Sequence, residues 1–255
     1  MSALFWESFG KRTAILLLVL SGLAPVAPAS AEDDPAFAVL VFSRTAGFRH
    51  DSIAAGIDAI QAIGAQDGFR VDASEDAGVF TDANLSKYRV VIFLSTTGEI
   101  LNSAQQAAFQ GFIRRGGGFV GIHSATDTAY DWPWFGALVG NYFRRHPAIQ
   151  SATLKVVDAS HPSTRHLPID WKRRDEWYDF RDAFAADLTI LMRIDETTYS
   201  GGRMGTNHPM AWYHAYDGGR AWYTALGHTI ASWSEPLFLD HVRGGIAWAA
   251  GLAPE

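Results

Sequence analysis

The stretch that decides the fold is Gly116-Gly117-Gly118-Phe119-Val120-Gly121-Ile122-His123-Ser124-Ala125. Its apolar part, residues 119–122, predicts a buried strand that ends abruptly in a Gly-x-His-x-Ala turn. Such a strand-to-helix turn lifts one side chain above the carboxyl edge of an α/β sheet, and small residues on either side of it prevent clashes. Many enzymes present a Ser or Cys nucleophile in this position, whereas this chain presents His123. An imidazole there serves as a base, an acid or a metal ligand.

Strand and helix patterns alternate along the chain before this turn. The apolar runs are typical of parallel strands buried on both faces, and they cover residues 37–42, 69–72, 88–94 and 119–122. A helix is expected after the first run, where isoleucines recur at helical spacing, and another from its N-cap, Ser103, through Arg114. This alternation predicts a doubly wound α/β fold with a mostly parallel sheet.

After residue 145, apolar and polar residues alternate between turn residues, which is typical of antiparallel strands. The expected strands cover residues 153–157, 175–180, 188–194, 210–216 and 220–226. Asp217-Gly218-Gly219 joins the last two and predicts a hairpin, and residues 235–250 predict a final helix. We therefore expect antiparallel strands that extend or cap the sheet within a single domain.

The N-terminal residues 1–31 have the pattern of a secretory signal peptide. Lys11 and Arg12 precede a short apolar run, and Ala29-Ser30-Ala31 forms a small-x-small cleavage site. The apolar run is shorter than the roughly 20 residues that a membrane-spanning helix needs. We therefore expect residues 32–255 to form one exported domain, periplasmic or secreted, with an uncleaved N-terminal anchor as the alternative.

Composition limits the classes of ligand and cofactor. The chain has 255 residues, a net charge of −6 and no cysteine, which excludes disulfides, thiol catalysis and cysteine-based zinc sites. A divalent metal could be held only by His, Asp and Glu, and no local spacing of these residues signals such a site. The acidic balance argues against nucleic acid and an anionic membrane as partners, and no stable membrane insertion is expected. Nine tryptophans and eight tyrosines favour a small carbohydrate ligand, whose apolar face packs on aromatic rings. The composition allows the protein to be a homo-oligomer.

Ligands of open α/β sheets bind outside the carboxyl ends of the strands, so polar residues that follow strands are site candidates. Arg49 and His50 follow the first expected strand, and His123 and Asp127 follow the fourth. Ordinary structural roles compete with these assignments. His50 could be an N-terminal helix residue, His123 a buried imidazole with one hydrogen bond, and Asp127 either a cap of the next helix or a group that orients His123.

The second half of the chain adds candidates in aromatic surroundings. In the expected strand 175–180, a period of two places Glu176, Tyr178 and Phe180 on one face. Each single histidine could simply form a hydrogen bond in a loop, but their recurrence at expected strand ends favours a shared site. The histidine candidates are His146, His208 and His228, whereas His161, His166 and His241 are expected to be surface or structural residues.

Taken together, these motifs resemble the ThuA-like (trehalose-utilisation) family, a branch of the class I glutamine-amidotransferase-like fold. The residues that carry the resemblance are 44–50, 121–123, 143–147, 175–178, 209–212, 219–228 and 244–251. The resemblance implies a flavodoxin-like three-layer sandwich and a role in the catabolism of trehalose or related disaccharides at the level of oxidised keto-sugars. His123 replaces the amidotransferase cysteine, which excludes glutamine hydrolysis through a thioester.

The leading expectation is an exported enzyme, a hydrolase or lyase, that acts on a disaccharide or keto-sugar. His123, His50 and Glu176 would supply acid–base chemistry, and Arg49 or a divalent metal held by His and Glu would stabilise a forming enolate. The expected substrate-binding residues are Arg49, Asp127, His146, Tyr178, His208 and His228. The alternatives are a non-catalytic sugar-binding module and a metal-dependent hydrolase.

Overall fold

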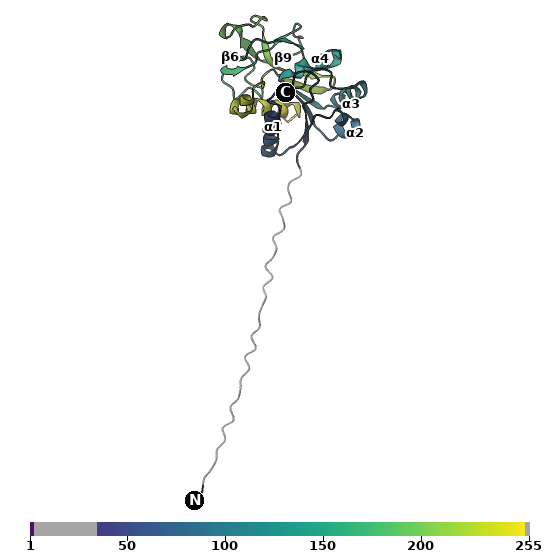
Figure 1. Cartoon of the computed structure of the whole chain (residues 1–255), viewed down its shortest axis with the longest axis vertical. Helices are drawn as coiled ribbons and strands as arrows, with labels where there is room; N and C mark the ends of the chain where they lie inside the picture. Colours follow the sequence, from purple (N-terminus) through teal and green to yellow (C-terminus); the bar gives the residue numbers. More distant parts are fainter. Residues whose placement is uncertain (3–34, 253–255) are drawn as a thin grey trace. The chain divides into compact units, whose positions relative to one another are not determined.

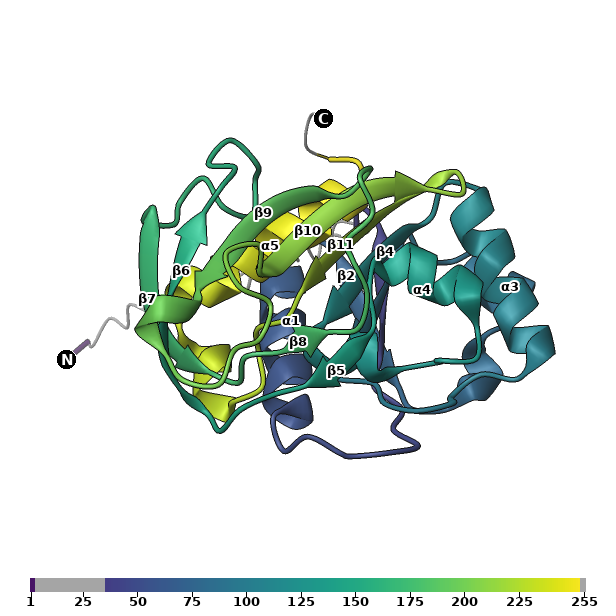
Figure 2. The same ribbon diagram turned by 90° about the horizontal axis from the view of Figure 1, so that it is seen from above.

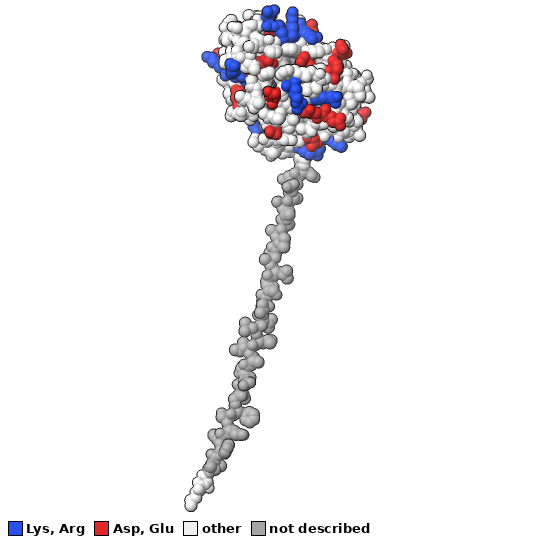
Figure 3. All heavy atoms as spheres, in the orientation of Figure 1, with Lys and Arg blue, Asp and Glu red and all other residues white. Residues whose placement is uncertain are grey.

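The computed structural model describes residues 1–2 and 35–252 (Figure 1). The expected signal peptide therefore lies almost wholly outside the described residues. Within the described part of the chain, none of the helices has the length and apolar character needed to span a bilayer. Basic and acidic side chains are interspersed on the face of the molecule that Figure 3 shows.

Five neighbouring parallel strands form one half of a nine-stranded sheet, here called the parallel half. Every residue of its β1, β3 and β4 strands is buried, because helices cover both faces. In spatial order its strands are β2 (Arg70–Ser74), β1 (Ala38–Phe42), β3 (Val90–Leu94), β4 (Gly118–Ile122) and β11 (Gly219–Thr224). The predicted doubly wound arrangement is confirmed.

The antiparallel half, residues 143–216, continues the same sheet beyond β11. The predicted hairpin joins β10 to β11, and Asp217 and Gly218 in its turn have φ angles of 47° and 94°, as type I′ turns require. In spatial order the added strands are β10 (Pro209–Tyr216), β9 (Thr189–Asp195), β6 (Gln150–Val156) and β7 (Asp170–Asp175). A separate two-stranded sheet pairs β5 (Phe143–Arg145) with β8 (Asp179–Phe180).

The helices form the two outer layers of a three-layer sandwich (Figure 2). The first and last helices contact each other on one face, and α3 and α4 lie together on the other. One boundary differs from its prediction: Asn102 rather than Ser103 caps α3, because its side chain accepts a hydrogen bond from the backbone of Gln105. The helices are α1 (Ile53–Asp67), α2 (Asp82–Leu85), α3 (Ser103–Arg114), α4 (Pro133–Val139) and α5 (Pro236–Ala249).

A cluster of phenylalanine rings fixes the parallel half against α3 and α4. The Phe93 ring on β3 lies 5.3 Å from Phe109 of α3 and 5.5 Å from both Phe119 of β4 and Phe135 of α4. All four rings are buried, and each contributes about 1.5–3 kcal/mol to folding. This packing holds the strand whose carboxyl end carries His123.

The prediction of a single strand over residues 175–180 is wrong. Strand β7 ends at Asp175, and the chain pairs again only from Asp179. The Asp175 carboxylate accepts a hydrogen bond from the backbone N–H of Glu176 at 3.0 Å, which turns the chain out of the sheet. Glu176 and Tyr178 therefore do not share a strand face. They belong to a connection that reaches the carboxyl edge of the parallel half.

Candidate active site at the carboxyl ends of the parallel strands

His123 occupies the predicted strand-to-helix turn. It is the first residue of the 3-10 helix η2 (His123–Asp127), and its φ of 52° lies in the left-handed region that non-glycine residues rarely adopt. The Tyr223 hydroxyl holds this backbone by donating to the His123 carbonyl at 2.7 Å. The imidazole is 0 % exposed, and its Nδ1–H donates to the Ala225 carbonyl at 2.9 Å. The lone pair of His123 Nε2 is therefore available to the site.

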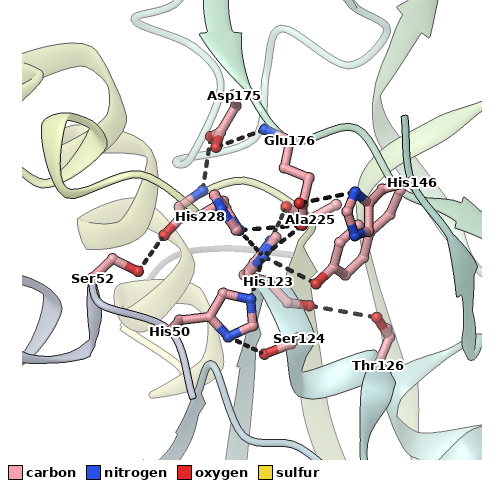
Figure 4. A network of polar contacts seen from close by, with 12 residues as sticks. His50, Ser52, His123, Ser124, Thr126, His146, Asp175, Glu176, Ala225 and His228 are labelled. Carbon is pink, nitrogen blue, oxygen red and sulfur yellow. Dashed lines mark hydrogen bonds and ion pairs between the residues drawn. The ribbon is translucent and has the colours of Figure 1, made fainter. Parts of the chain in front are cut away.

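Three potential metal-binding side chains converge on His123 Nε2, as Figure 4 shows. His50 Nε2 lies at 3.1 Å, His228 Nδ1 at 3.0 Å and Glu176 Oε2 at 3.4 Å. Ligand-type atoms of all four residues lie within 4.8 Å of one another. The structure thus brings together the three residues that the sequence marked for acid–base chemistry, and it adds His228 to them.

Contacts between loops position these side chains. The Ser52 hydroxyl, at the N-cap of α1, donates to the Gly227 carbonyl at 3.2 Å and links the loop that carries His50 to the loop that carries His228. Gly227 has a φ of 102°, which allows the sharp turn after β11. The His50 Nδ1 atom lies 3.3 Å from the Ser124 hydroxyl, next to the strand-to-helix turn. The loops after β1, β4 and β11 therefore form one connected unit.

The protonation states of His50 and Glu176 suit a cation. Burial, followed by the nearby imidazoles, lowers the pKa of His50 to about 3, so this imidazole is neutral at pH 7. Burial opposes ionisation of Glu176, but its contacts with the His123 and His228 imidazoles outweigh burial and hold the carboxyl pKa well below its ordinary value. Burial lowers the pKa of His228, but the hydrogen bond to Glu176 and the attraction of its carboxylate have the larger effect, so the pKa of His228 is raised overall. Glu176 is therefore an ionised carboxylate among imidazoles.

These residues have the chemistry of a divalent metal site. The single lone pair of His123 Nε2 faces two imidazole nitrogens, a carboxylate oxygen and the Tyr178 hydroxyl, and it cannot form good hydrogen bonds with all of them. A divalent cation would satisfy the facing lone pairs together, and three histidines with one carboxylate are ligands that Zn²⁺ and similar transition metals accept. The His123 Nδ1–H contact with a backbone carbonyl is the outer contact that metal-binding histidines usually make.

His146 is the most exposed imidazole of the site. Its side chain is 43 % exposed, and Nδ1 lies 2.9 Å from both Glu176 Oε1 and the Pro147 carbonyl oxygen. Both neighbours accept hydrogen bonds, so Nδ1 carries the proton and Nε2 carries the lone pair. Glu176 therefore orients His146 with one oxygen and faces the histidine cluster with the other. Tyr178 lies beside them, buried, with its hydroxyl 3.0 Å from His123 Nε2.

Three predicted site residues lie outside this cluster. Arg49 forms an exposed ion pair with Glu75 at 2.7 Å. His208 is buried behind Tyr178, where it contacts Glu196 at 2.8 Å and the Tyr178 carbonyl at 2.7 Å. Their predicted part in substrate binding gains no support from this placement.

Asp127, the third, neither caps the next helix nor orients His123, and its part in substrate binding stays a prediction. Its carboxylate accepts a hydrogen bond from the Tyr130 hydroxyl at 2.5 Å. It does not cap the next helix, because α4 begins at Pro133 with Trp132 at the N-cap. Among the described residues no hydrogen bond joins Asp127 to His123, so the expectation that it orients that imidazole is not met either.

Sequence reasoning missed Asp175, which is fully buried. Its carboxylate accepts hydrogen bonds from the backbone N–H groups of Glu176 and Gly227, at 3.0 and 2.9 Å, and forms an ion pair with Arg173 at 3.2 Å. It thereby fixes two of the segments that carry cluster residues. A signal was present, because β7 alternates and places Arg173 and Asp175 on its buried face, where unpaired charges are costly.

The sequence matches the ThuA family, described as trehalose utilisation, over residues 38–249. The chain belongs to the ThuA family. This membership supports a function related to carbohydrates. None of the curated proteins compared with the chain is similar to it at a significant level.

Solved structures of two ThuA-like proteins share the fold. The protein from Bacteroides uniformis has a TM-score of 0.72 and 21 % identity, covering 88 % of this chain and 95 % of its own. The protein from Parabacteroides merdae has a TM-score of 0.71 and 21 % identity, covering 87 % and 92 %. A β-galactosidase from Bacillus circulans has a TM-score of 0.54 and 13 % identity, and the match covers 85 % of this chain and 31 % of the enzyme. At these identities the likeness concerns the fold alone.

Proposed function

We propose that this protein is an exported metal-dependent enzyme that cleaves oxidised disaccharides. The observation that carries the proposal is the convergence of three imidazole nitrogens and one carboxylate beside a solvent-accessible imidazole, His146. The description of the family as trehalose utilisation supports a substrate derived from a disaccharide. The signal-peptide pattern of residues 1–31 supports export.

His50, His123, His228 and Glu176 would hold the metal. When bound, a divalent cation supplies a Lewis acid that polarises a carbonyl oxygen and stabilises negative charge on it. We prefer this role to direct acid–base chemistry by His123, because its imidazole is 0 % exposed and already faces four polar groups. A substrate could not reach Nε2 without displacing them.

His146 would act as the acid–base residue. Its Nε2 takes the proton from the carbon next to the sugar ketone, and the electron pair that remains expels the glycosidic oxygen from the following carbon. The protonated imidazole then returns the proton to the departing oxygen. Glu176 keeps the ring in the required tautomer and stabilises its charged form, as carboxylates beside catalytic histidines do. Such a residue contributes about 10²–10⁴-fold to the rate.

Metal analysis combined with a cleavage assay tests the proposal. The protein, purified without a histidine tag, should carry one metal ion per chain, lose activity on an oxidised trehalose after EDTA treatment, and regain it with added metal. Substoichiometric metal together with cleavage that resists EDTA would contradict the metal-dependent mechanism and favour direct acid–base catalysis by the histidines. Calorimetric binding of a disaccharide with no product after long incubation would instead support the sugar-binding module.

A further inference from the structure

We infer that Phe48, Ile149 and Ile230 form a subsite for the second sugar ring of the substrate, the ring that cleavage releases. This inference rests on the proposed function, because it places the reacting ring at the histidine cluster. The three side chains lie around a hollow of about 240 Å³ beside that cluster. The remaining residues that line the hollow are His50, Asp51, His228 and Thr229.

The exposure of these apolar side chains is the first observation. Phe48 is 67 % exposed and Ile230 is 58 % exposed, although both are large and apolar. Single exposed apolar residues are common on protein surfaces and need no explanation. Here, however, two of them come from segments that follow different strands, β1 and β11, and border the same hollow as Ile149. An apolar surface around a polar centre suggests that a ligand covers it.

The backbone beneath Phe48 is fixed, so its exposed ring does not belong to a loose loop. The Thr97 hydroxyl donates to the Phe48 carbonyl at 2.9 Å, and the Gly47 N–H donates to the same hydroxyl at 3.2 Å. The Ala46 N–H also donates to the Thr97 carbonyl at 2.7 Å. A platform held in place before a ligand arrives loses little entropy on binding.

Size and chemistry match one sugar ring. The hollow is smaller than the roughly 300–1,000 Å³ of pockets that enclose drug-sized ligands, so it would accommodate a ring rather than an oligosaccharide. A pyranose has an apolar face of C–H groups and a rim of hydroxyls. Phe48 and the two isoleucines suit that face, while the Asp51 carboxylate can accept hydrogen bonds from hydroxyls at the rim.

The hollow is continuous with the histidine cluster. The Phe48 ring packs edge-on against His50, with ring centroids 4.9 Å apart and an interplanar angle of 81°. The His50 ring packs in the same manner against His123, at 4.7 Å and 87°. His50 therefore has the hollow on one side and the proposed metal on the other. A disaccharide could place one ring at each, which would give a preference for two-ring substrates.

Calorimetry with unmodified trehalose tests the subsite independently of turnover. Phe48→Ala should bind trehalose about tenfold more weakly than the wild type, a change of about 1.4 kcal/mol, because the aromatic face that covers the sugar ring is lost. Phe48→Trp should recover the affinity, because it restores an aromatic face. Ile169→Ala is the matched control, because Ile169 is also a large apolar residue, 61 % exposed, but lies outside the hollow. Metal content should be unchanged in all three variants.

Two results overturn the subsite: no measurable binding of trehalose to the wild type, or equal affinity in the wild type and Phe48→Ala. Failure of the proposed function would look different. A protein without metal or turnover that still binds trehalose through Phe48 would contradict the enzyme but retain the subsite. A metal-dependent enzyme whose KM for the oxidised disaccharide is the same in Phe48→Ala would contradict the subsite alone.

Discussion

The two halves of the sheet contribute different groups to the site. The parallel half supplies three imidazoles, those of His50, His123 and His228, each shortly after the end of a strand, and the first two are buried. The antiparallel half supplies Glu176 and His146, of which the imidazole is accessible to solvent. If the proposed function is correct, the parallel half holds the metal and the antiparallel half moves the proton.

The difference follows from strand direction. All parallel strands end at the same edge, so residues after β1, β4 and β11 gather without any special device. Antiparallel neighbours end at opposite edges, so their side chains reach the site only where the chain leaves the sheet. The turn that Asp175 imposes at Glu176 is such a place. The experiments below separate the two contributions, beginning with the largest expected effect.

His123→Ala removes the nitrogen that the other cluster groups face. We expect loss of bound metal and a fall in activity of more than about 100-fold, because even outer contacts of metal ligands are worth 10–100-fold. Metal analysis and the cleavage assay measure both. His166→Ala is the control, since His166 contacts the Leu237 carbonyl away from the cluster. Full metal content in His123→Ala would contradict the proposal that residues of the parallel half bind the metal.

His146→Ala should separate metal binding from proton transfer. We expect metal content to be retained and kcat to fall by about 10²–10⁴-fold, because the accessible base is lost. Steady-state kinetics and metal analysis on the same preparation provide the comparison. Unchanged kcat would show that the antiparallel half does not supply the base, and parallel loss of metal and activity would make His146 a ligand instead.

Asp175→Asn tests the link between the two halves. The change keeps the shape of the side chain but removes its negative charge. In the wild type the Asp175 carboxylate pairs with Arg173 and accepts a hydrogen bond from the Gly227 N–H. We expect metal affinity, measured by competition with a chelator, to fall about 10–100-fold. Urea unfolding of the same variant reports the stability cost of the broken ion pair. Wild-type metal affinity would mean that Asp175 does not position the site.

The smallest expected effect concerns His241, a fully buried imidazole on α5 beneath the parallel half. Burial lowers its pKa to about 3 in the folded protein. Below about pH 6.5 the unfolded chain therefore binds a proton that the folded chain does not, and stability falls by about 1.4 kcal/mol per pH unit until pH approaches that folded value. The contribution is fully retained above pH 6.5.

His241→Gln should remove this part of the acid sensitivity. Between pH 7 and pH 5, urea unfolding of the metal-free variant should lose roughly 2 kcal/mol less stability than the wild type. An identical pH dependence in the two proteins would mean that His241 is not held neutral in the folded state.

The regular parts of the fold could be predicted from the sequence because they depend on short-range patterns. The apolar runs of β1, β3 and β4, the hairpin turn at Asp217-Gly218 and the strand-to-helix turn at His123 each reflect a local steric or burial requirement. The 175–180 prediction failed for the opposite reason. The prediction extended a period of two over these residues, but the hydrogen bond between Asp175 and the Glu176 N–H interrupts the strand.

By itself, the sequence determined which imidazoles stand at strand ends, because that follows from the order of elements and the common direction of parallel strands. Only the tertiary structure decided which of them meet. Arg49, Asp127 and His208 have equally suggestive positions in the chain, yet partners elsewhere hold them, namely Glu75, Tyr130 and Glu196. Several side chains that are distant in sequence could bind the same polar groups, and the packing of the folded chain determines which of them are close enough to do so.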